Sequence, residues 1–254
     1  MRQDADALEL VSTLKRDVFG VVELVRGADG LFVRRRARAT RLDPRAVLAR
    51  TLLARERAAL ARLDGLAGVP RLSRHDRGRP DELVRTHLAG VPLQHAARIP
   101  RDFFDRLDEL VVALHARGVC HNDLHKEPNI LVGTDGRPAL LDFQLASVHA
   151  GRRTRAFDVR AGEDLRHAEK HRRRYARFGG ALQGVGASGA GAGRKRSMLA
   201  LCWRHAGKPA WDWLRGSVLR TRELEGGRPN AGPWPEWTEP VGRRTVGRDA
   251  PTAP

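Results

Sequence analysis

The stretch of residues 121–144, HNDLHKEPNILVGTDGRPALLDFQ, holds the densest group of side chains able to perform chemistry. Asp123 lies in a polar loop, Asn129 follows six residues later, and Asp142 comes directly after an apolar run. An ionised carboxylate only accepts hydrogen bonds, and an amide adds a neutral oxygen. Oxygen ligands of this kind suit Mg²⁺ in the presence of phosphate. The sequence therefore predicts an oxygen-rich site for a magnesium ion and phosphate groups.

Two short apolar segments between Asn129 and Asp142 predict a β-hairpin. Residues 130–132 and 139–141 flank a turn at residues 134–136, and its Asp-Gly pair suits the positive φ angles of a tight hairpin. Such a hairpin brings the residue before its first strand close to the residue after its second strand. We therefore expect Asn129 and Asp142 to lie side by side.

An amphipathic helix is predicted over residues 102–117, directly before the polar loop. The apolar residues that recur at helical spacing are Phe103, Leu107, Leu110, Val111 and Leu114. Gly118 follows them, and glycine commonly ends a helix because it readily adopts a left-handed backbone. The helix and its glycine stop therefore position the loop that contains Asp123.

Residues 31–36, LFVRRR, predict an apolar strand that runs into three arginines. Side chains alternate between the two faces of a strand, so only one of Arg34 and Arg35 points inward. An inward arginine can hold two phosphate oxygens with its planar fork of donors. We place Arg35 in that position and keep Arg34 as the alternative. A solvated basic face is the other interpretation of this cluster.

A long helix is predicted over residues 44–63. Its apolar residues at helical spacing are Val47, Leu48, Leu52, Leu53, Leu60 and Leu63. Glu56 lies among them on a helix that is otherwise rich in arginine. We predict an ion pair between Glu56 and Arg35. An ordinary helical pair between Glu56 and a neighbouring arginine is the alternative.

Shorter segments complete the order of elements before the loop. Residues 1–12 predict a polar lead-in, and residues 14–25 predict two short strands around a Phe-Gly turn. An edge strand is expected from Leu72, and residues 83–88 predict a further strand. Residues 89–93, AGVPL, then connect this strand to the rest of the chain.

The part of the chain after the loop begins with a predicted helix over residues 163–178, with acidic residues first and basic residues last. Asp164, near the start of this helix, either braces the loop of Asp123 or acts only near the helix cap. Beyond the helix we expect a flexible linker rich in Gly, Ala and Ser at residues 179–193. Two helices should follow at residues 197–204 and 210–220, and then a disordered tail at residues 226–254.

The chain has 254 residues, which fits one large domain or two small lobes. Hydrophobic residues make up 41% of the sequence, enough to support a core. The formal net charge is +17, and most of the basic residues are arginines. This charge attracts nucleotides, phosphorylated sugars, anionic membrane surfaces or nucleic acid, without choosing among them.

Two cysteines, Cys120 and Cys202, are too few for a disulfide framework or a zinc site. The first residues lack the apolar core of a signal peptide. No run approaches the roughly 18 consecutive apolar residues of a membrane span. We therefore expect a cytoplasmic protein without a transmembrane segment, and peripheral contact with the inner face of the membrane stays open.

The order His121-x-Asp123, then Asn129, then Asp142 with a following Phe resembles the catalytic and metal loops of protein-kinase-like phosphotransferases. Within that superfamily it is most similar to the small bacterial RIO-like and lipopolysaccharide-core kinases. Two departures stand out. The spacing from Asp to Asn is one residue longer than in the usual catalytic loop, and Gln144 replaces the glycine of the usual metal loop.

The resemblance implies an α+β class and a two-lobed protein-kinase-like fold. Residues 1–90 are expected to form an N-lobe with a small antiparallel sheet and one long helix. Residues 91–225 are expected to form a mostly helical C-lobe that carries the catalytic and metal loops. Residues 226–254 remain as the tail.

The resemblance also implies roles for the loop residues and two cofactors, ATP and Mg²⁺. Asp123 would orient the acceptor hydroxyl and accept its proton. His121 would order the catalytic loop by hydrogen bonding. Asn129 and Asp142 would hold Mg²⁺.

Five further positions receive nucleotide-binding roles from the resemblance. Arg35, positioned by Glu56, would hold the α- and β-phosphates of ATP. Gly20 lies where a loop would cover the nucleotide, because glycine permits close approach of the backbone to phosphate. The main chain from Thr86 to Leu88 would form hydrogen bonds with adenine.

The function implied is ATP- and Mg²⁺-dependent transfer of the γ-phosphate to a hydroxyl, with protein Ser/Thr as the favoured acceptor. A sugar hydroxyl of a lipopolysaccharide core is an alternative acceptor. The basic surface suits an anionic glycolipid at the inner membrane face and suits RNA equally well. A catalytically silent kinase-like binding module is the second hypothesis, favoured by Gln144 and by the missing strand lysine.

Overall fold

The computed structural model describes residues 7–16, 19–37, 44–151 and 153–178. Its class is α+β, as the sequence predicts, and every strand pair in the described part is antiparallel. In chain order the elements, with 3₁₀ turns written η, are β1 (Glu9–Arg16), β2 (Gly20–Gly27), β3 (Gly30–Ala37), α1 (Pro44–Arg62), β4 (Glu82–Thr86), β5 (Gly90–Pro92), η1 (Leu93–His95), α2 (Phe103–Ala116), β6 (Val119–Cys120), η2 (Glu127–Asn129), β7 (Ile130–Gly133), β8 (Pro138–Leu140), η3 (Phe143–Leu145), β9 (Ser147–Val148) and α3 (Arg155–Phe178).

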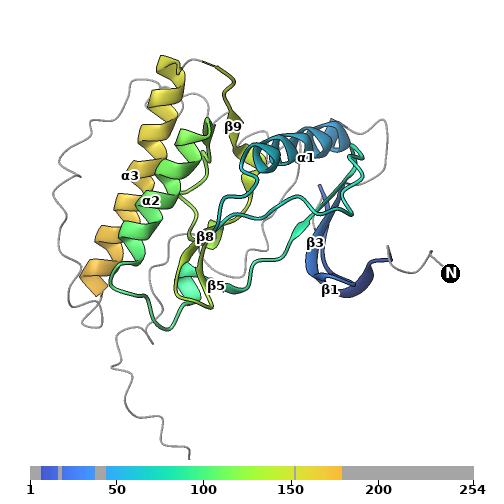
Figure 1. Cartoon of the computed structure of the whole chain (residues 1–254), viewed down its shortest axis with the longest axis horizontal. Helices are drawn as coiled ribbons and strands as arrows, with labels where there is room; N and C mark the ends of the chain where they lie inside the picture. Colours follow the sequence, from blue (N-terminus) through green and yellow to red (C-terminus); the bar gives the residue numbers. More distant parts are fainter. Residues whose placement is uncertain (1–6, 17–18, 38–43, 152, 179–254) are drawn as a thin grey trace, which may run out of the picture.

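The first half of the described chain forms a four-stranded sheet in the order β1-β2-β3-β4, with α1 lying beside it (Figure 1). Strands β2 and β3 are joined by a tight turn, and their register pairs Gly27 with Gly30. On one face of the sheet, Phe32, Val25 and Val84 form a small apolar cluster. The next residues of β3 alternate in direction, which decides the environment of its arginines.

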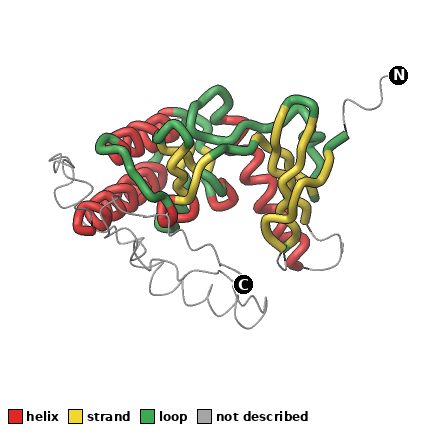
Figure 2. Tube along the Cα trace, turned by 90° about the horizontal axis from the view of Figure 1, so that it is seen from below, coloured by secondary structure: helices red, strands yellow, loops and turns green. Residues whose placement is uncertain are grey.

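Helices α2 and α3 pack side by side at the other end of the molecule (Figure 2). Two small sheets accompany them: β5-β7-β8 and β6-β9. The hairpin of β7 and β8 has the predicted turn, in which Gly136 has a φ of 76° and donates its amide to the carbonyl of Gly133. This hairpin follows the polar loop directly and fixes its far end.

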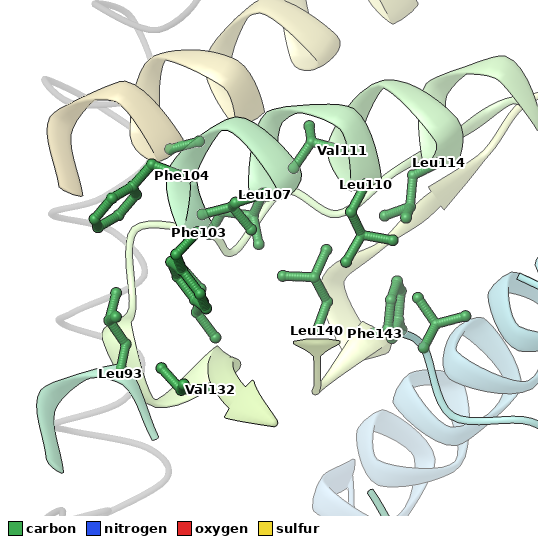
Figure 3. Packing of buried hydrophobic residues seen from close by; sticks show 14 of the residues in the cluster. Leu93, Phe103, Phe104, Leu107, Leu110, Val111, Leu114, Val132, Leu140 and Phe143 are labelled. Atoms are coloured by element: carbon green, nitrogen blue, oxygen red, sulfur yellow. The ribbon is translucent and has the colours of Figure 1, made fainter. Parts of the chain in front are cut away.

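The main core lies between α2, the β7–β8 hairpin and the end of α1. Figure 3 shows the apolar side chains of α2 directed toward Leu140 and Phe143, which flank the residue Asp142. Leu60 and Leu63, at the end of α1, belong to the same cluster and are fully buried. Because α1 also contacts the first sheet, it connects that sheet to the core beneath the loop.

Three predicted elements differ from the structure. The last helix begins at Arg155 rather than at residue 163, because Thr154 Oγ1 accepts a hydrogen bond from a main-chain amide of the first turn. Leu72 makes only an isolated β-bridge and starts no strand. The predicted polar lead-in is already a strand from Glu9, because its backbone pairs with β2.

The predicted boundary near residue 90 coincides with a change of sheet, since β4 pairs with β3 whereas β5 pairs with β7. The boundary between two lobes stays a prediction. The predicted linker, closing helices and tail all follow residue 178 and lie outside the described residues. Among the helices that the structure describes, none combines the length and apolar character needed to cross a membrane.

Candidate active site

The loop between β6 and β7 places Asp123 and Asn129 in direct contact. Both are buried, with 2% and 5% of their surfaces exposed. The Asn129 Nδ2 amide donates to the Asp123 carbonyl at 3.0 Å and to Asp123 Oδ2 at 2.9 Å. Asp123 Oδ1, in contrast, is buried without a hydrogen-bond partner among the described residues. The longer spacing thus still brings the two side chains together and leaves one carboxylate oxygen available.

His121 holds the loop through both of its ring nitrogens. Nδ1 accepts a hydrogen bond from the amide of Asp123 at 3.3 Å, and Nε2 lies 2.8 Å from the carbonyl of Leu141. A nitrogen facing a carbonyl must donate, so the ring carries its proton on Nε2. His121 therefore ties the loop to the end of the hairpin, which is the geometry expected of a residue that orders the loop.

Asn122 and Asp142 are the two non-glycine residues with positive φ in the described part of the chain, at 65° and 63°. This left-handed conformation is uncommon for residues other than glycine, although Asn and Asp adopt it more readily than most. Such conformations gather at functional sites because the surrounding structure has to impose them. Here both residues flank Asp123 and Asn129.

The oxygens predicted to hold Mg²⁺ have free coordination sites. The amide of Leu141 donates to the carbonyl of Asn129 at 2.9 Å, which keeps residues 129 and 142 close, as the hairpin predicts. Asn129 directs its amide nitrogen to Asp123, so its side-chain oxygen forms no hydrogen bond within the described part. Asp142 uses Oδ1 for Arg35 and is 33% exposed. These hard oxygen donors fit a magnesium ion.

Arg35 projects from β3 toward α1 and the hairpin end. Its Nη1 donates to Glu56 Oε2 at 2.7 Å and to Asp142 Oδ1 at 3.0 Å, and its Nη2 donates to Gln144 Oε1 at 3.2 Å. The predicted ion pair with Glu56 is therefore present. Arg34, the alternative, lies on the opposite face and pairs with Glu23. The role of Arg35 in binding phosphate stays a prediction.

The charges in this cluster shift the pKa values of its members. Burial works against the charge of Arg35, but the carboxylates of Glu56 and Asp142 outweigh it and raise the pKa of Arg35 above its usual range. Burial likewise works against the charge of Asp142, and the nearby Arg35 cation outweighs it, lowering the pKa of Asp142 to about 2. Both groups therefore remain charged at neutral pH.

Arg85 is a member of this cluster that the sequence did not point out. It comes from β4, is 6% exposed, and has its Nε 3.1 Å from Glu56 Oε1 without hydrogen-bond geometry. Burial lowers the pKa of Arg85, and Glu56 offsets only part of this effect. Glu56 thus faces two arginines. The short strand around position 85 shows no clear alternation, so the sequence offered no signal that Arg85 points inward.

Helix α3 supports the loop that contains Asp123. Asp164 is fully buried and accepts hydrogen bonds from the amides of His121 at 2.7 Å and Asn122 at 2.9 Å. About two turns further along α3, His171 Nε2 lies 2.8 Å from the carbonyl of Leu124. Burial lowers the pKa of His171, which keeps this ring neutral. Of the two interpretations of Asp164, the structure therefore supports the brace.

The loop between Asp123 and Asn129 is anchored to the same helix through Glu127. Glu127 is 3% exposed, accepts a hydrogen bond from Tyr175 Oη at 2.9 Å, and lies 2.9 Å from Arg174 Nη1. Burial and the Glu127 carboxylate raise the pKa of Tyr175, so the phenol keeps its proton. The extra length of the loop is thus taken up by a buried contact, which explains how Asn129 still reaches Asp123. Sequence reasoning treated this insert only as a departure.

Two basic side chains stand beside the candidate base. Lys126 Nζ lies 3.3 Å from Asp123 Oδ2, and His125 Nδ1 lies 3.1 Å from Asp123 Oδ1. Both side chains are partly exposed, at 36% and 47%. The Lys126 ammonium therefore adds positive charge directly beside the Asp123 carboxylate. The sequence pattern gave no separate indication that Lys126 would lie beside Asp123.

For the three remaining residues predicted to contact the nucleotide, Gly20, Thr86 and Leu88, the structure shows the main-chain environment. At Gly20, with a φ of 155°, an added Cβ would lie 1.9 Å from the carbonyl oxygen of Arg36, so strand packing alone requires glycine. The amide of Thr86 donates to the carbonyl of Arg71 at 2.9 Å and is not available to adenine. The amide of Leu88 forms no hydrogen bond within the described residues and remains available.

The site combines a buried Asp–Asn pair, a second carboxylate after a hairpin and an Arg–Glu ion pair, a set of groups that fits a phosphotransferase. Residues 7–150, more than half of the chain, match the Phosphotransferase enzyme family, abbreviated APH. The chain belongs to this family of kinase-type enzymes.

One curated relative is a protein of Streptomyces coelicolor (strain ATCC BAA-471 / A3(2) / M145) described as a probable SapB synthase. It is 39% identical over 117 residues, which cover 38% of this chain. The chain spans only 12% of the length of that relative. The similarity therefore concerns one segment of a much longer protein.

Proposed function

We propose that this protein is an ATP- and Mg²⁺-dependent kinase that transfers the γ-phosphoryl group of ATP to a hydroxyl. The observation that carries the proposal is Asp123 Oδ1, a buried carboxylate oxygen that forms no hydrogen bond among the described residues and has the partly exposed His125 ring 3.1 Å away. Leaving such an atom unsatisfied costs free energy. An acceptor hydroxyl bound at this point would remove that cost and would place its proton on the atom suited to take it.

In the proposed step, Asp123 Oδ1 takes the proton of the acceptor hydroxyl while the hydroxyl oxygen bonds to the γ-phosphorus. The bond from that phosphorus to the β–γ bridging oxygen breaks, and ADP leaves with the electron pair. Asn129 and His121 keep the carboxylate in position through the hydrogen bonds described above. Lys126 supplies positive charge near the transferred group.

Asn129 and Asp142 are the residues that would hold Mg²⁺, and Arg35 is the residue that would hold the phosphates. A bound magnesium ion neutralises phosphate charge. Arg35 has five N–H donors, of which three are used by Glu56, Asp142 and Gln144. The Nε donor and one Nη2 donor have no partner within the described part of the chain, and two donors of one guanidinium form a fork for phosphate.

Adenine is proposed to bind along the connection between β4 and β5, with the amide of Leu88 as its donor. Gly20, at the start of β2, is proposed to let the covering strand approach the phosphates. Residues 1–90 and 91–225 would then act as two lobes around the nucleotide. These assignments follow the order of elements in the resemblance and the free amide at residue 88.

We further propose that the acceptor is a Ser or Thr hydroxyl of a protein. The support is the similarity of residues 121–144 to RIO-like kinases. A sugar hydroxyl of a lipopolysaccharide core is the competing acceptor. Its support is the other half of the same resemblance, together with a formal net charge of +17 that suits an anionic glycolipid. We also propose a cytoplasmic location, and the positive charge supports contact with the inner membrane face or with RNA.

The test is transfer of radioactive γ-phosphate by the purified full chain in the presence of Mg²⁺. Protein substrates and lipopolysaccharide-core sugars are offered separately, and ATP hydrolysis is followed as well. We expect Asp123→Asn to lower kcat by about 10²–10⁴-fold while nucleotide affinity changes little. Asp142→Asn should weaken the dependence on Mg²⁺. If the wild type binds ATP but is as inert as both variants toward every acceptor, the silent binding module is the correct reading.

A further inference from the structure

The side chain of Gln144 forms one hydrogen bond among the described residues, and its partner is Arg35. Its Oε1 accepts a hydrogen bond from Arg35 Nη2 at 3.2 Å. The preceding residue, Phe143, is fully buried in the core, and Asp142 adopts the left-handed conformation that starts the short turn η3. The backbone that leads into Gln144 is therefore fixed, and the Gln144 side chain is partly buried against the guanidinium.

The guanidinium of Arg35 is held by acceptors from three separate places in the fold. Glu56 comes from α1, whereas Asp142 and Gln144 come from the end of the hairpin. The two carboxylates both bind Nη1. The contact to Nη2 from Gln144 adds a second point of attachment. Two points on a planar group fix its orientation, and this directs the remaining donors.

We propose that Gln144 is a positioning residue that orients Arg35 for the phosphates of the nucleotide, and that the two residues form a matched pair. The inference rests on the proposed function. A lysine ammonium is a compact charge with rotatable donors, so it requires no such orientation. An arginine fork does require it, and a glycine at position 144 would offer no acceptor. The two departures from the usual pattern, at positions 35 and 144, thus explain each other.

The neutrality of Gln144 is part of the inference. Glu56 and Asp142 already place two negative charges on Arg35, which is 15% exposed. An amide oxygen holds the guanidinium without adding a third negative charge beside the phosphates. A carboxylate at position 144 would hold Arg35 at least as firmly but would repel the nucleotide. Glutamine is therefore an acceptor that orients the cation and leaves its charge for the ligand.

The experiment compares Gln144→Met, Gln144→Glu, Arg35→Ala and the double variant Arg35→Ala with Gln144→Met. Affinity for Mg²⁺-ATP is measured by titration calorimetry of the full chain, and thermal melting checks the fold. Gln144→Met keeps the length of the side chain and removes the acceptor. Leu145→Met, at the next position of η3 and 39% exposed, is the matched control and should change affinity by less than about twofold.

We expect Gln144→Met to weaken ATP affinity about tenfold, the effect of one hydrogen bond to a charged group. The KM for ATP should rise in the same proportion, with a smaller change in kcat. Gln144→Glu should also weaken binding, and this loss should shrink at high salt because its cause is charge. In the Arg35→Ala background, Gln144→Met should have no further effect, since Gln144 acts through Arg35.

An equal loss from Gln144→Met in both backgrounds would overturn the inference and leave the proposed function intact. Unchanged affinity in Gln144→Met would do the same. If Arg35→Ala itself leaves ATP affinity unchanged, the phosphate role of Arg35 fails, and the inference fails with it. Should Gln144→Met melt well below the wild type, Gln144→Ala supplies the same comparison with a smaller side chain.

Discussion

Strand β3 carries arginines on both of its faces, and each face offers them one buried glutamate. On the outer face, Arg34 and Arg36 share Glu23, at 2.9 Å and 2.6 Å. On the inner face, Arg35 meets Glu56 at 2.7 Å. The two glutamates are almost equally buried, with 3% and 0% exposed. Burial of the acid therefore does not separate the two clusters.

The difference lies in what each cluster connects. The outer arginine side chains are 19% and 50% exposed, and Glu23 lies on β2, directly across from Arg34 in the register. That cluster links two neighbouring strands at the surface. The inner cluster links β3 to α1, to β4 through Arg85, and to the loop of Asp142. A network that joins distant segments and keeps free donors is suited to bind a ligand.

The largest expected contrast is in stability. Glu56→Gln would leave Arg35 and Arg85 buried with one carboxylate fewer, which should cost about 3–5 kcal/mol of unfolding free energy. Glu23→Gln affects arginines that reach solvent, so its cost should stay near 1 kcal/mol. Urea denaturation of both variants gives the comparison. Equal losses would show that the two clusters play the same structural role.

The second contrast is in nucleotide binding. Arg35→Ala should weaken affinity for Mg²⁺-ATP by about 30–100-fold, since it removes a charge-assisted phosphate contact. Arg36→Ala removes an arginine of the same strand whose side chain points to the other face, so affinity should change less than about twofold. Titration of both variants with ATP and with adenosine distinguishes phosphate from adenine binding. A larger loss for Arg36→Ala would move the phosphate contact to the outer face.

The inner cluster also shows how far the sequence could be used. Strand alternation puts only one of Arg34 and Arg35 on the inner face of β3, and the resemblance supplies Glu56 as the partner of Arg35. The pair could therefore be predicted from the sequence. Arg85 could not be found in the same way. Its position depends on which face of β4 meets α1, and the short segment around it offers no clear alternation. Tertiary packing, rather than local pattern, brings the second arginine to Glu56.

The catalytic loop shows the same limit. The hairpin pattern predicts that residues 129 and 142 are neighbours, and the structure confirms it through the Leu141 amide. The buried contact of Glu127 with Tyr175 was not predictable, because 48 residues separate the two in the chain. A glutamate in a polar insert normally lies in solvent. The sequence likewise gave no sign that the amide of Thr86, expected to face adenine, donates to the carbonyl of Arg71.

A third prediction extends the comparison to Glu127. This buried acid holds the loop between Asp123 and Asn129 against α3 and has no proposed contact with the nucleotide. Tyr175→Phe removes the hydrogen bond to Glu127 while keeping the ring packed. It should cost about 1–2 kcal/mol of stability and lower kcat several-fold, because Asn129 is held less firmly. The KM for ATP should change little, in contrast to Arg35→Ala. A change confined to stability would show that Glu127 supports the fold alone.

The smallest expected effect is the acid dependence of the inner cluster. Asp142 has a folded-state pKa lowered to about 2, below its ordinary value of 3.8, mainly because Arg35 offsets the effect of burial. A depressed pKa contributes stability that is present above the ordinary value and is lost as the pH falls toward the folded value. The stability difference between the wild type and Asp142→Asn should therefore be constant above about pH 5 and should narrow between about pH 4 and pH 2. Urea midpoints of both proteins across this range measure the difference.

Glu23→Gln gives the comparison on the outer face. Burial works against the charge of Glu23, but its two arginines outweigh burial and lower the pKa of Glu23 as well. If the difference for Asp142 widened with acid, the Arg35 contact would not be what depresses its pKa, and the inner cluster would be held by Glu56 alone.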